Sequence, residues 1–212
     1  MNHVVIMAGG IGSRFWPIST PEKPKQFIDI LGCGRTFIQM TFDRFKGIVE
    51  PSNVWVVTSG KYVDIVREQL PEIPVGNILH EPCRRNTAPC IGYVSWKIKA
   101  IDKNANIVVT PSDHMVTDVV EFQRVISLAL DFTKDSDAIV TLGMPPTRPE
   151  TGYGYIQADY QSPAMSNRSI YAVDSFKEKP DRKTAEEYIK HKEYLWNAGI
   201  FIWKAETRRS TL

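Results

Sequence analysis

The sequence of 212 residues has few cysteines and no long apolar run. Its three cysteines, Cys33, Cys83 and Cys90, show neither CxxC nor histidine spacing, so the sequence indicates neither a disulfide framework nor a zinc site. The longest apolar runs, such as residues 199–203, are far shorter than the roughly eighteen residues that a membrane span requires. We therefore expect a globular protein of a reducing cytoplasm.

A large excess of one charge is also absent. The chain has 26 Lys plus Arg against 24 Asp plus Glu, a formal net charge of +2. This balance argues against a dedicated nucleic-acid binder with a strongly basic face, but it leaves anionic small ligands open. The first apolar stretch, residues 4–8, is too short for a signal-peptide core and has no basic flank, so we do not expect export.

Short β-branched runs alternate with segments of helical period along most of the chain. Strands are expected at residues 3–7, 54–58, 77–80, 107–110 and 138–142, with helices between them. This alternation is typical of an α/β sandwich, in which strands lie parallel and helices form the crossovers.

The pattern changes from Pro145, where prolines and glycines become frequent. Strands of a more antiparallel character and one short helix are expected there, at residues 155–158, 169–177 and 199–203 and at 183–191. We therefore divide the chain into halves at 1–144 and 145–212. Residues 204–212 are polar and end without a capping element, so we expect a chain that is truncated at its carboxyl end.

A glycine-rich loop directly follows the first strand, with the sequence Ala8-Gly9-Gly10-Ile11-Gly12-Ser13-Arg14-Phe15-Trp16-Pro17. Glycines at this place let backbone N–H groups approach phosphate oxygens, although a plain tight turn also explains them. The dinucleotide pattern GxGxxG is not matched, because Phe15 occupies its third glycine position, and the pattern GxxxxGK[ST] is absent. Two cations, Arg14 and Lys25, belong to the same loop.

Residues 9–17, together with Pro24-Lys25-Gln26-Phe27, resemble the signature of nucleoside-diphosphate-sugar pyrophosphorylases, and in detail that of the mannose-1-phosphate guanylyltransferase branch. The resemblance implies a Rossmann-like three-layer sandwich with a mixed, mainly parallel central sheet. It implies that Arg14 acts on the departing pyrophosphate and Lys25 on the reacting phosphates. The nucleotide-binding residues that it implies in the loop are Ala8, Gly9, Gly10, Gly12 and Ser13.

A second motif, Glu81-Pro82-Cys83-Arg84-Arg85-Asn86-Thr87-Ala88-Pro89, lies between an expected strand and an expected helix. From the residues alone, Glu81 and Asn86 offer an acceptor and an amide for a purine edge, but a helix cap with a solvated charge pair is favoured. Enzymes of the family that transfer GMP carry a similar EPxxRNTAP stretch at the site for the base. The resemblance therefore implies that guanine is bound by Glu81, Asn86, Thr87 and Ala88.

A third motif, Pro111-Ser112-Asp113-His114, follows the strand expected at 107–110. A carboxylate at a strand end suits Mg²⁺, which takes its other ligands from water and substrate phosphates. His114 is more often a structural hydrogen-bonding residue than half of a catalytic pair. The resemblance implies that Ser112 contacts the nucleotide and that Asp113 is one of two metal ligands, the second lying in a later segment.

Three further motifs lie in the second half: Thr151-Gly152-Tyr153-Gly154-Tyr155, Phe176-Lys177-Glu178-Lys179-Pro180 and Trp196-Asn197-Ala198-Gly199-Ile200-Phe201. Singly they are a glycine hairpin, a charged strand end and an aromatic core strand. In this order they resemble the sugar-binding half of the family. The resemblance implies that mannose is bound by Gly154, Glu178 and Asn197, and its phosphate by Lys179. Ala198 stands where the family carries serine, which puts one minor polar contact in question.

The reaction implied by the resemblance is attack by a phosphate oxygen of mannose 1-phosphate on the α-phosphorus of GTP. It gives GDP-mannose and pyrophosphate, with Mg²⁺ as cofactor and no protein nucleophile. Another hexose 1-phosphate, another nucleoside triphosphate and a nucleotide-binding module without turnover remain alternatives. An NAD-dependent oxidoreductase is disfavoured by Phe15 and by Thr58-Ser59-Gly60, where an acidic residue is required. Neither nucleic acid nor a membrane is expected as a partner, and a homodimer is left open.

Overall fold

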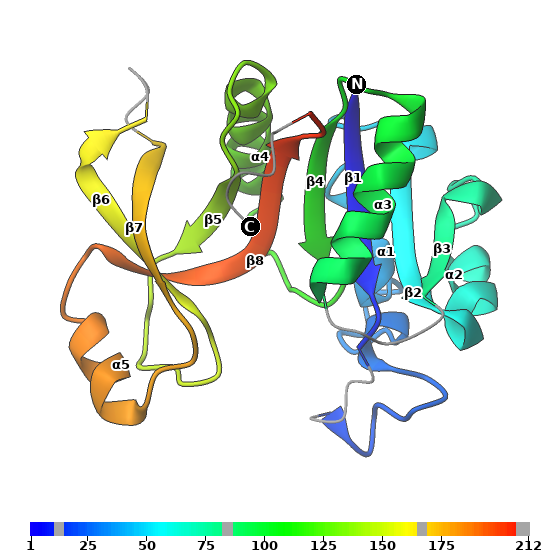
Figure 1. Ribbon diagram of the computed structural model, residues 1–212. Helices are drawn as coiled ribbons and strands as arrows, with labels where there is room; N and C mark the ends of the chain where they lie inside the picture. Colours follow the sequence, from blue (N-terminus) through cyan, green and yellow to red (C-terminus); the bar gives the residue numbers. More distant parts are fainter. Residues whose placement is uncertain (11–14, 82–86, 165–168, 207–212) are drawn as a thin grey trace. The chain divides into compact units, whose positions relative to one another are not determined.

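The computed structural model describes residues 1–10, 15–81, 87–164 and 169–206 (Figure 1). The chain folds into two compact units. The first contains Met1–Val140 and the chain from Phe201 onward, and the second contains Thr141–Ile200. The division expected from the sequence, a nucleotide-binding half at 1–144 and a sugar-phosphate-binding half at 145–212, stays a prediction.

The first unit is built on a mixed sheet. Strands β1 (Asn2–Ala8), β2 (Val54–Ser59), β3 (Ile78–Glu81) and β4 (Asn106–Pro111) are parallel, in the order β3-β2-β1-β4. The end of β8 (Tyr194–Lys204) pairs with β4 in the antiparallel sense, from Asn106 opposite Lys204 to Val109 opposite Phe201. The α/β class and the mixed, mainly parallel sheet expected from the sequence are confirmed.

Helices cover this sheet because its central strands are apolar throughout. In β1, Val4, Val5 and Ile6 are fully buried although neighbouring side chains point to opposite faces, so both faces are covered. Helix α3 (Thr87–Ile101) packs its buried residues Val94 and Ile98 into the same core cluster as Val5, and it crosses β1 in Figure 1. Helix α1 (Phe37–Asp43) also contacts β1, α2 (Val63–Gln69) contacts β2, and α4 (Val119–Lys134) contacts β4.

Short 3-10 helices complete the connections of the first unit. They are η2 (Lys25–Phe27), η3 (Pro51–Asn53), η4 (Gly60–Tyr62) and η5 (Val75–Asn77). In the described part of the loop between β1 and α1, η2 supplies a turn of regular structure. None of the helices in the described part of the chain combines the length and the apolar character that a bilayer crossing requires.

The second unit is antiparallel. Strand β6 (Tyr155–Pro163) pairs with β7 (Tyr171–Lys177) on one side and with the first part of β8 on the other, and β5 (Val140–Met144) pairs with β8. Helix α5 (Arg182–Tyr188) begins where the Asp181 side chain accepts a hydrogen bond of 2.7 Å from the Thr184 amide. Its Tyr188 ring stacks on Tyr194 with centroids 4.2 Å apart, which ties the helix to β8.

A buried histidine makes the stability of the first unit sensitive to pH. His3 in β1 is 1% exposed, and its Nδ1 accepts a hydrogen bond of 3.2 Å from Trp55 Nε1. Burial lowers the pKa of the His3 imidazole from its ordinary value, and the nearby Asp102 carboxylate opposes this shift only in part. The fold therefore accommodates the neutral imidazole.

We expect the free energy of unfolding to fall as the pH drops below about 6.5, because the unfolded chain then binds a proton that folded His3 does not. The measurement is the thermal midpoint between about pH 7.5 and 5.5. His3→Gln keeps an acceptor for Trp55 and does not titrate, so its midpoint should decline less steeply than that of the wild type. His80→Gln, at an exposed position, is the matched control. Equal slopes for wild type and His3→Gln would contradict this assignment.

Candidate functional site

The glycine-rich loop begins at the carboxyl end of β1. Ala8 is fully buried, whereas Gly9 and Gly10 are exposed. A Cβ atom added at Gly9 or Gly10 would meet no described atom within 4 Å, and neither residue has a positive φ. Neither crowding nor backbone strain among the described residues therefore requires glycine at these two positions. Gly12, Ser13 and Arg14 lie outside the described residues.

Gln26 of η2 fixes the start of this loop. Its side chain is 2% exposed, and Nε2 donates hydrogen bonds to the Ala8 carbonyl at 3.3 Å and to the Gly10 carbonyl at 2.8 Å. Thr58 Oγ1 at the end of β2 donates to the same Ala8 carbonyl at 2.9 Å. Gln26 was not among the site residues expected from the sequence. Its position in the sequence could have pointed to it, because Gln26 lies between Lys25, which was expected to act on phosphates, and the apolar Phe27, a residue type that is usually buried.

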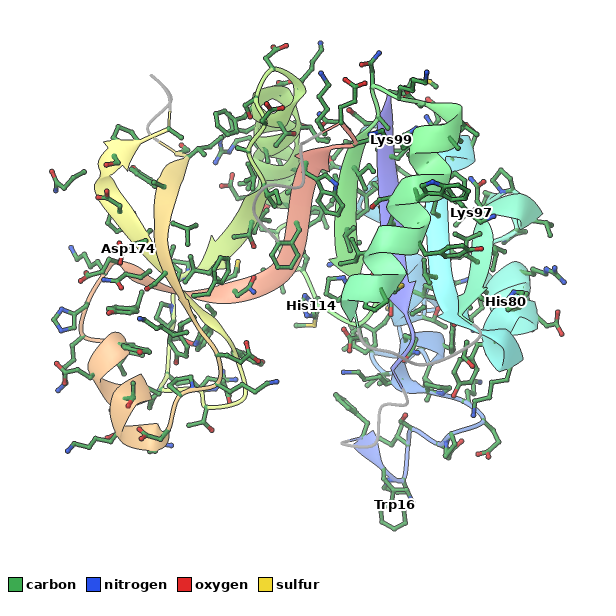
Figure 2. The ribbon with its side chains drawn as sticks, viewed as in Figure 1. Trp16, His80, Lys97, Lys99, His114 and Asp174 are labelled. Carbon is green, nitrogen blue, oxygen red and sulfur yellow. The ribbon has the colours of Figure 1, made fainter. Side chains whose placement is uncertain are left out.

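The long loop after β1 is anchored to η4 and ends on a buried aromatic residue. The Pro21 carbonyl accepts a hydrogen bond of 2.7 Å from Tyr62 Oη and one of 3.0 Å from Lys61 Nζ. Phe27 is fully buried, with its ring centroid 5.5 Å from that of Tyr62. Trp16 points away from the ribbon (Figure 2), and it is 78% exposed.

The lysine and the aspartate that the sequence singled out lie in contact. Lys25 Nζ is 2.6 Å from Asp113 Oδ2, and the two side chains are 24% and 29% exposed. Lys25 Nζ also lies 5.0 Å from the centre of the Phe15 ring. Asp113 follows β4, whose parallel pairing with β1 brings the two strand ends to one edge of the sheet. Ser112 is buried, and its amide donates to the Met7 carbonyl at 3.2 Å.

His114 stands beside this pair and is labelled in Figure 2. Its Nε2 lies 4.0 Å from Asp113 Oδ1, which is beyond hydrogen-bond distance. Burial lowers the pKa of the His114 imidazole; Asp113 opposes the shift, while Arg44 and Lys25 add to it. The His114 backbone carbonyl accepts a hydrogen bond of 3.2 Å from Arg44 Nη1.

The expected base-binding motif spans the end of β3 and the start of α3. Glu81 is the last residue of β3, and Thr87 and Ala88 are the first two residues of α3. Asn86 lies outside the described residues. The backbone at Glu81 is at the carboxyl end of a parallel strand, where ligands of open α/β sheets bind.

The three residues expected to bind the sugar lie together in the second unit. The backbone N–H of Asn197 donates to the Gly154 carbonyl at 2.8 Å. A Cβ atom at Gly154 would lie 3.2 Å from Glu178 Oε2. Asn197 Oδ1 accepts hydrogen bonds from the Gly199 amide at 2.9 Å and from Thr141 Oγ1 at 3.2 Å. With Oδ1 occupied, the amide nitrogen Nδ2 is the part of the Asn197 side chain that could donate to a ligand.

Lys179 follows Glu178 in an unusual backbone conformation. Its φ is 40°, a region that non-glycine residues seldom adopt and that costs of order 1 kcal/mol or more. Lys179 Nζ lies 2.9 Å from Glu178 Oε1, and the two side chains are 60% and 75% exposed. Both charged groups are thus presented to solvent at the end of β7.

A metal site made entirely by the protein is not found in the described part of the chain, where no three His, Cys, Asp or Glu side chains gather to hold an ion. Mg²⁺ requires less, since it is commonly held by one or two carboxylates together with substrate phosphates and water. Asp113, partly exposed beside the glycine loop, offers such a carboxylate.

Comparisons with known proteins relate the chain to nucleotide transfer. The nucleotidyl transferase family model matches residues 3–211. An Escherichia coli mannose-1-phosphate guanylyltransferase is 39% identical over 209 residues, which are 95% of this chain and 44% of that protein. The alginate biosynthesis protein AlgA of Pseudomonas syringae pv. tomato is 38% identical over 205 residues, which are 95% of this chain and 41% of that protein.

A solved structure from Thermus thermophilus, described as a mannose-1-phosphate geranyltransferase, superimposes with a TM-score of 0.86 at 30% identity. The match covers 97% of this chain and 58% of that one. The chain thus spans less than half the length of the curated relatives above.

Gln26→Glu should destabilise the first unit by about 1–3 kcal/mol, because it replaces a buried donor with an acceptor that faces two carbonyl oxygens. The free energy of unfolding from denaturant titration measures this. Gln161→Glu makes the same chemical change at an exposed position and should alter the free energy by less than about 0.5 kcal/mol. Equal effects of the two substitutions would show that the Gln26 contacts do not fix the loop.

Proposed function

The chain belongs to the nucleotidyl transferase family, and from that premise we propose that it makes GDP-mannose and pyrophosphate from GTP and mannose 1-phosphate. The observation that carries the proposal is the contact of Lys25 with Asp113 beside the glycine loop. A cation for phosphates and a carboxylate for Mg²⁺ are the groups that nucleotidyl transfer requires at one place. The choice of guanine and mannose is supported by relatives that are named for that reaction.

In the proposed reaction a phosphate oxygen of mannose 1-phosphate attacks the α-phosphorus of GTP. The bond from the α-phosphorus to the oxygen that bridges to the β-phosphate breaks, and pyrophosphate leaves with that electron pair. The nucleophile is already anionic, so no side chain has to remove a proton. The protein has to hold two polyanions in line and neutralise their charge.

Lys25 and Asp113 neutralise each other without a ligand. Asp113 would hold Mg²⁺, and the bound ion would supply positive charge at the phosphates. With Asp113 engaged by the ion, the Lys25 ammonium group would be available to bind the reacting phosphates. Backbone N–H groups of the glycine loop and Arg14 contribute further donors in this proposal. The ion pair thus keeps both groups ready without leaving either charge unpaired.

The second unit supplies the groups for the sugar phosphate. Asn197 donates from Nδ2, because its Oδ1 is already occupied by Gly199 and Thr141. The Glu178 carboxylate accepts from sugar hydroxyls, and Gly154 leaves room beside it. Lys179 binds the phosphate, for which its exposed ammonium group is suited.

The same proposal includes a cytoplasmic location, where GTP is available, and the exposed Cys33 suits a reducing compartment. Two alternatives use the same site. In the first, the substrate is another hexose 1-phosphate or another nucleoside triphosphate; in the second, the site binds its ligands without turnover.

We expect this chain to release pyrophosphate from GTP with mannose 1-phosphate and Mg²⁺, faster than from ATP, UTP, CTP or dTTP. Lys25→Ala should lower kcat by about 10²–10³-fold, because it removes a cation from the developing charge, and should leave the thermal midpoint within a few degrees. Lys23→Ala removes an exposed lysine from the same loop and should leave kcat unchanged. An unchanged kcat in Lys25→Ala would remove Lys25 from the mechanism.

Asn197→Asp tests the sugar half. The substitution keeps the acceptor for Gly199 and Thr141 but removes the donor and adds a negative charge, so KM for mannose 1-phosphate should rise about tenfold or more while KM for GTP changes little. Steady-state kinetics with each substrate varied in turn give both values. Asn104→Asp, at an exposed position of the first unit, should change neither KM. A rise confined to KM for GTP would assign Asn197 to the other substrate.

A further inference from the structure

Arg44, directly after α1, is a buried cation that faces no carboxylate at ion-pair distance among the described residues. It is 4% exposed, and burial lowers the pKa of its guanidinium to about 10, so the group stays charged at neutral pH. Nη2 donates to Thr41 Oγ1 at 2.6 Å, and the guanidinium lies 5.3 Å from the centre of the Phe122 ring. Nε has no hydrogen-bond partner within the described ranges.

The energetics do not favour such a residue for stability alone. Burying a charge costs several kcal/mol in desolvation, and neither a carboxylate nor a full set of acceptors repays it here. Replacing whole buried ion pairs by apolar side chains of similar size is often neutral or stabilising, so a buried charge is weak evidence of a role in stability. The position therefore calls for an explanation beyond packing.

The contacts of Arg44 lead to the turn that carries Asp113. Nη1 donates to the carbonyl of His114, the residue after Asp113. Arg44 is itself held from α4, because Gln123 Nε2 donates to the Arg44 carbonyl at 3.0 Å and to the Lys46 carbonyl at 3.1 Å. At its start the turn is held by the hydrogen bond from the Ser112 amide to the Met7 carbonyl of β1. The turn is thus held at its start by the bond to β1 and at its end by Arg44.

We propose that Arg44 is a positioning residue, which holds the Ser112–His114 turn from behind and keeps the Asp113 carboxylate in place for Lys25 and for the metal. Arg44 itself touches no substrate in this scheme. The catalytic consequence rests on the proposed function, whereas the structural consequence, a turn that loosens without Arg44, does not.

Three variants separate the contributions. Arg44→Met keeps the length and removes both charge and donors, and Arg44→Lys keeps the charge without the two-pronged donor geometry. Lys46→Met removes a neighbouring lysine that is 58% exposed, as the matched control. Each is measured by thermal unfolding, by hydrogen exchange of the segment 111–115 in the ligand-free chain, and by kcat and KM for both substrates.

We expect Arg44→Met to unfold at the wild-type temperature or above it, to exchange amides of segment 111–115 about fivefold faster or more, and to lower kcat about 10–100-fold with both KM values within about threefold. Arg44→Lys should lie between Arg44→Met and the wild type, and Lys46→Met should match the wild type. This combination of retained stability with lost turnover is not the signature of a merely structural residue.

Wild-type exchange of segment 111–115 in Arg44→Met, or wild-type kcat, would overturn the proposal. If Arg44→Met fails to fold, the same two measurements on Arg44→Lys decide. If the wild-type chain shows no turnover with any nucleotide, the proposed function fails, and the exchange of segment 111–115 still confirms or overturns the support of the turn by Arg44.

Discussion

The parallel pairing of β1 with β4 is the constraint on which the rest of the site depends. Met7 lies opposite Pro111, so the glycine loop and the Asp113 turn leave the sheet at the same level and the same edge. The hydrogen bond from the Ser112 amide to the Met7 carbonyl holds the two strand ends in this register. A slip of one residue would exchange the two faces of a strand and force each buried side chain into the packing on the opposite face. The apolar core that fixes the register therefore also fixes the distance between a cation and a carboxylate from distant parts of the chain.

Polar side chains inside this framework act on backbone groups. Gln26 holds two carbonyls of the glycine loop, and Arg44 holds the carbonyl that follows Asp113. Both side chains are almost fully buried. A backbone that is held by buried donors has little freedom to relax when a charged ligand arrives, which is the condition for electrostatic preorganisation. The partly or fully exposed charged residues of the site, by contrast, form ion pairs with one another, Lys25 with Asp113 and Lys179 with Glu178.

The sequence predicted the central strands well, because strands that are buried on both faces are continuous apolar runs, as Val4 to Ile6 illustrate. It predicted β8 only from residue 199, whereas the strand begins at Tyr194, since its half-buried start mixes aromatic and polar residues. Gln26 and Arg44 escaped notice because a polar residue in a loop or at a helix end is usually solvated. Their burial follows from contacts with residues 16 and 70 positions away, which no local pattern encodes. The roles of the site residues remain predictions, and Gly12, Ser13, Arg14 and Asn86 lie outside the described residues.

The antiparallel partner of β4 is the end of β8, which the ribosome makes long after β4 itself. At roughly 5–20 residues per second, the β4 edge stays open for several seconds while the second unit is being synthesised. An open apolar edge is a template for pairing with other chains. The sheet of the first unit is therefore complete only after residues 201–204 have been made, and until then its β4 edge is open to pairing with other chains.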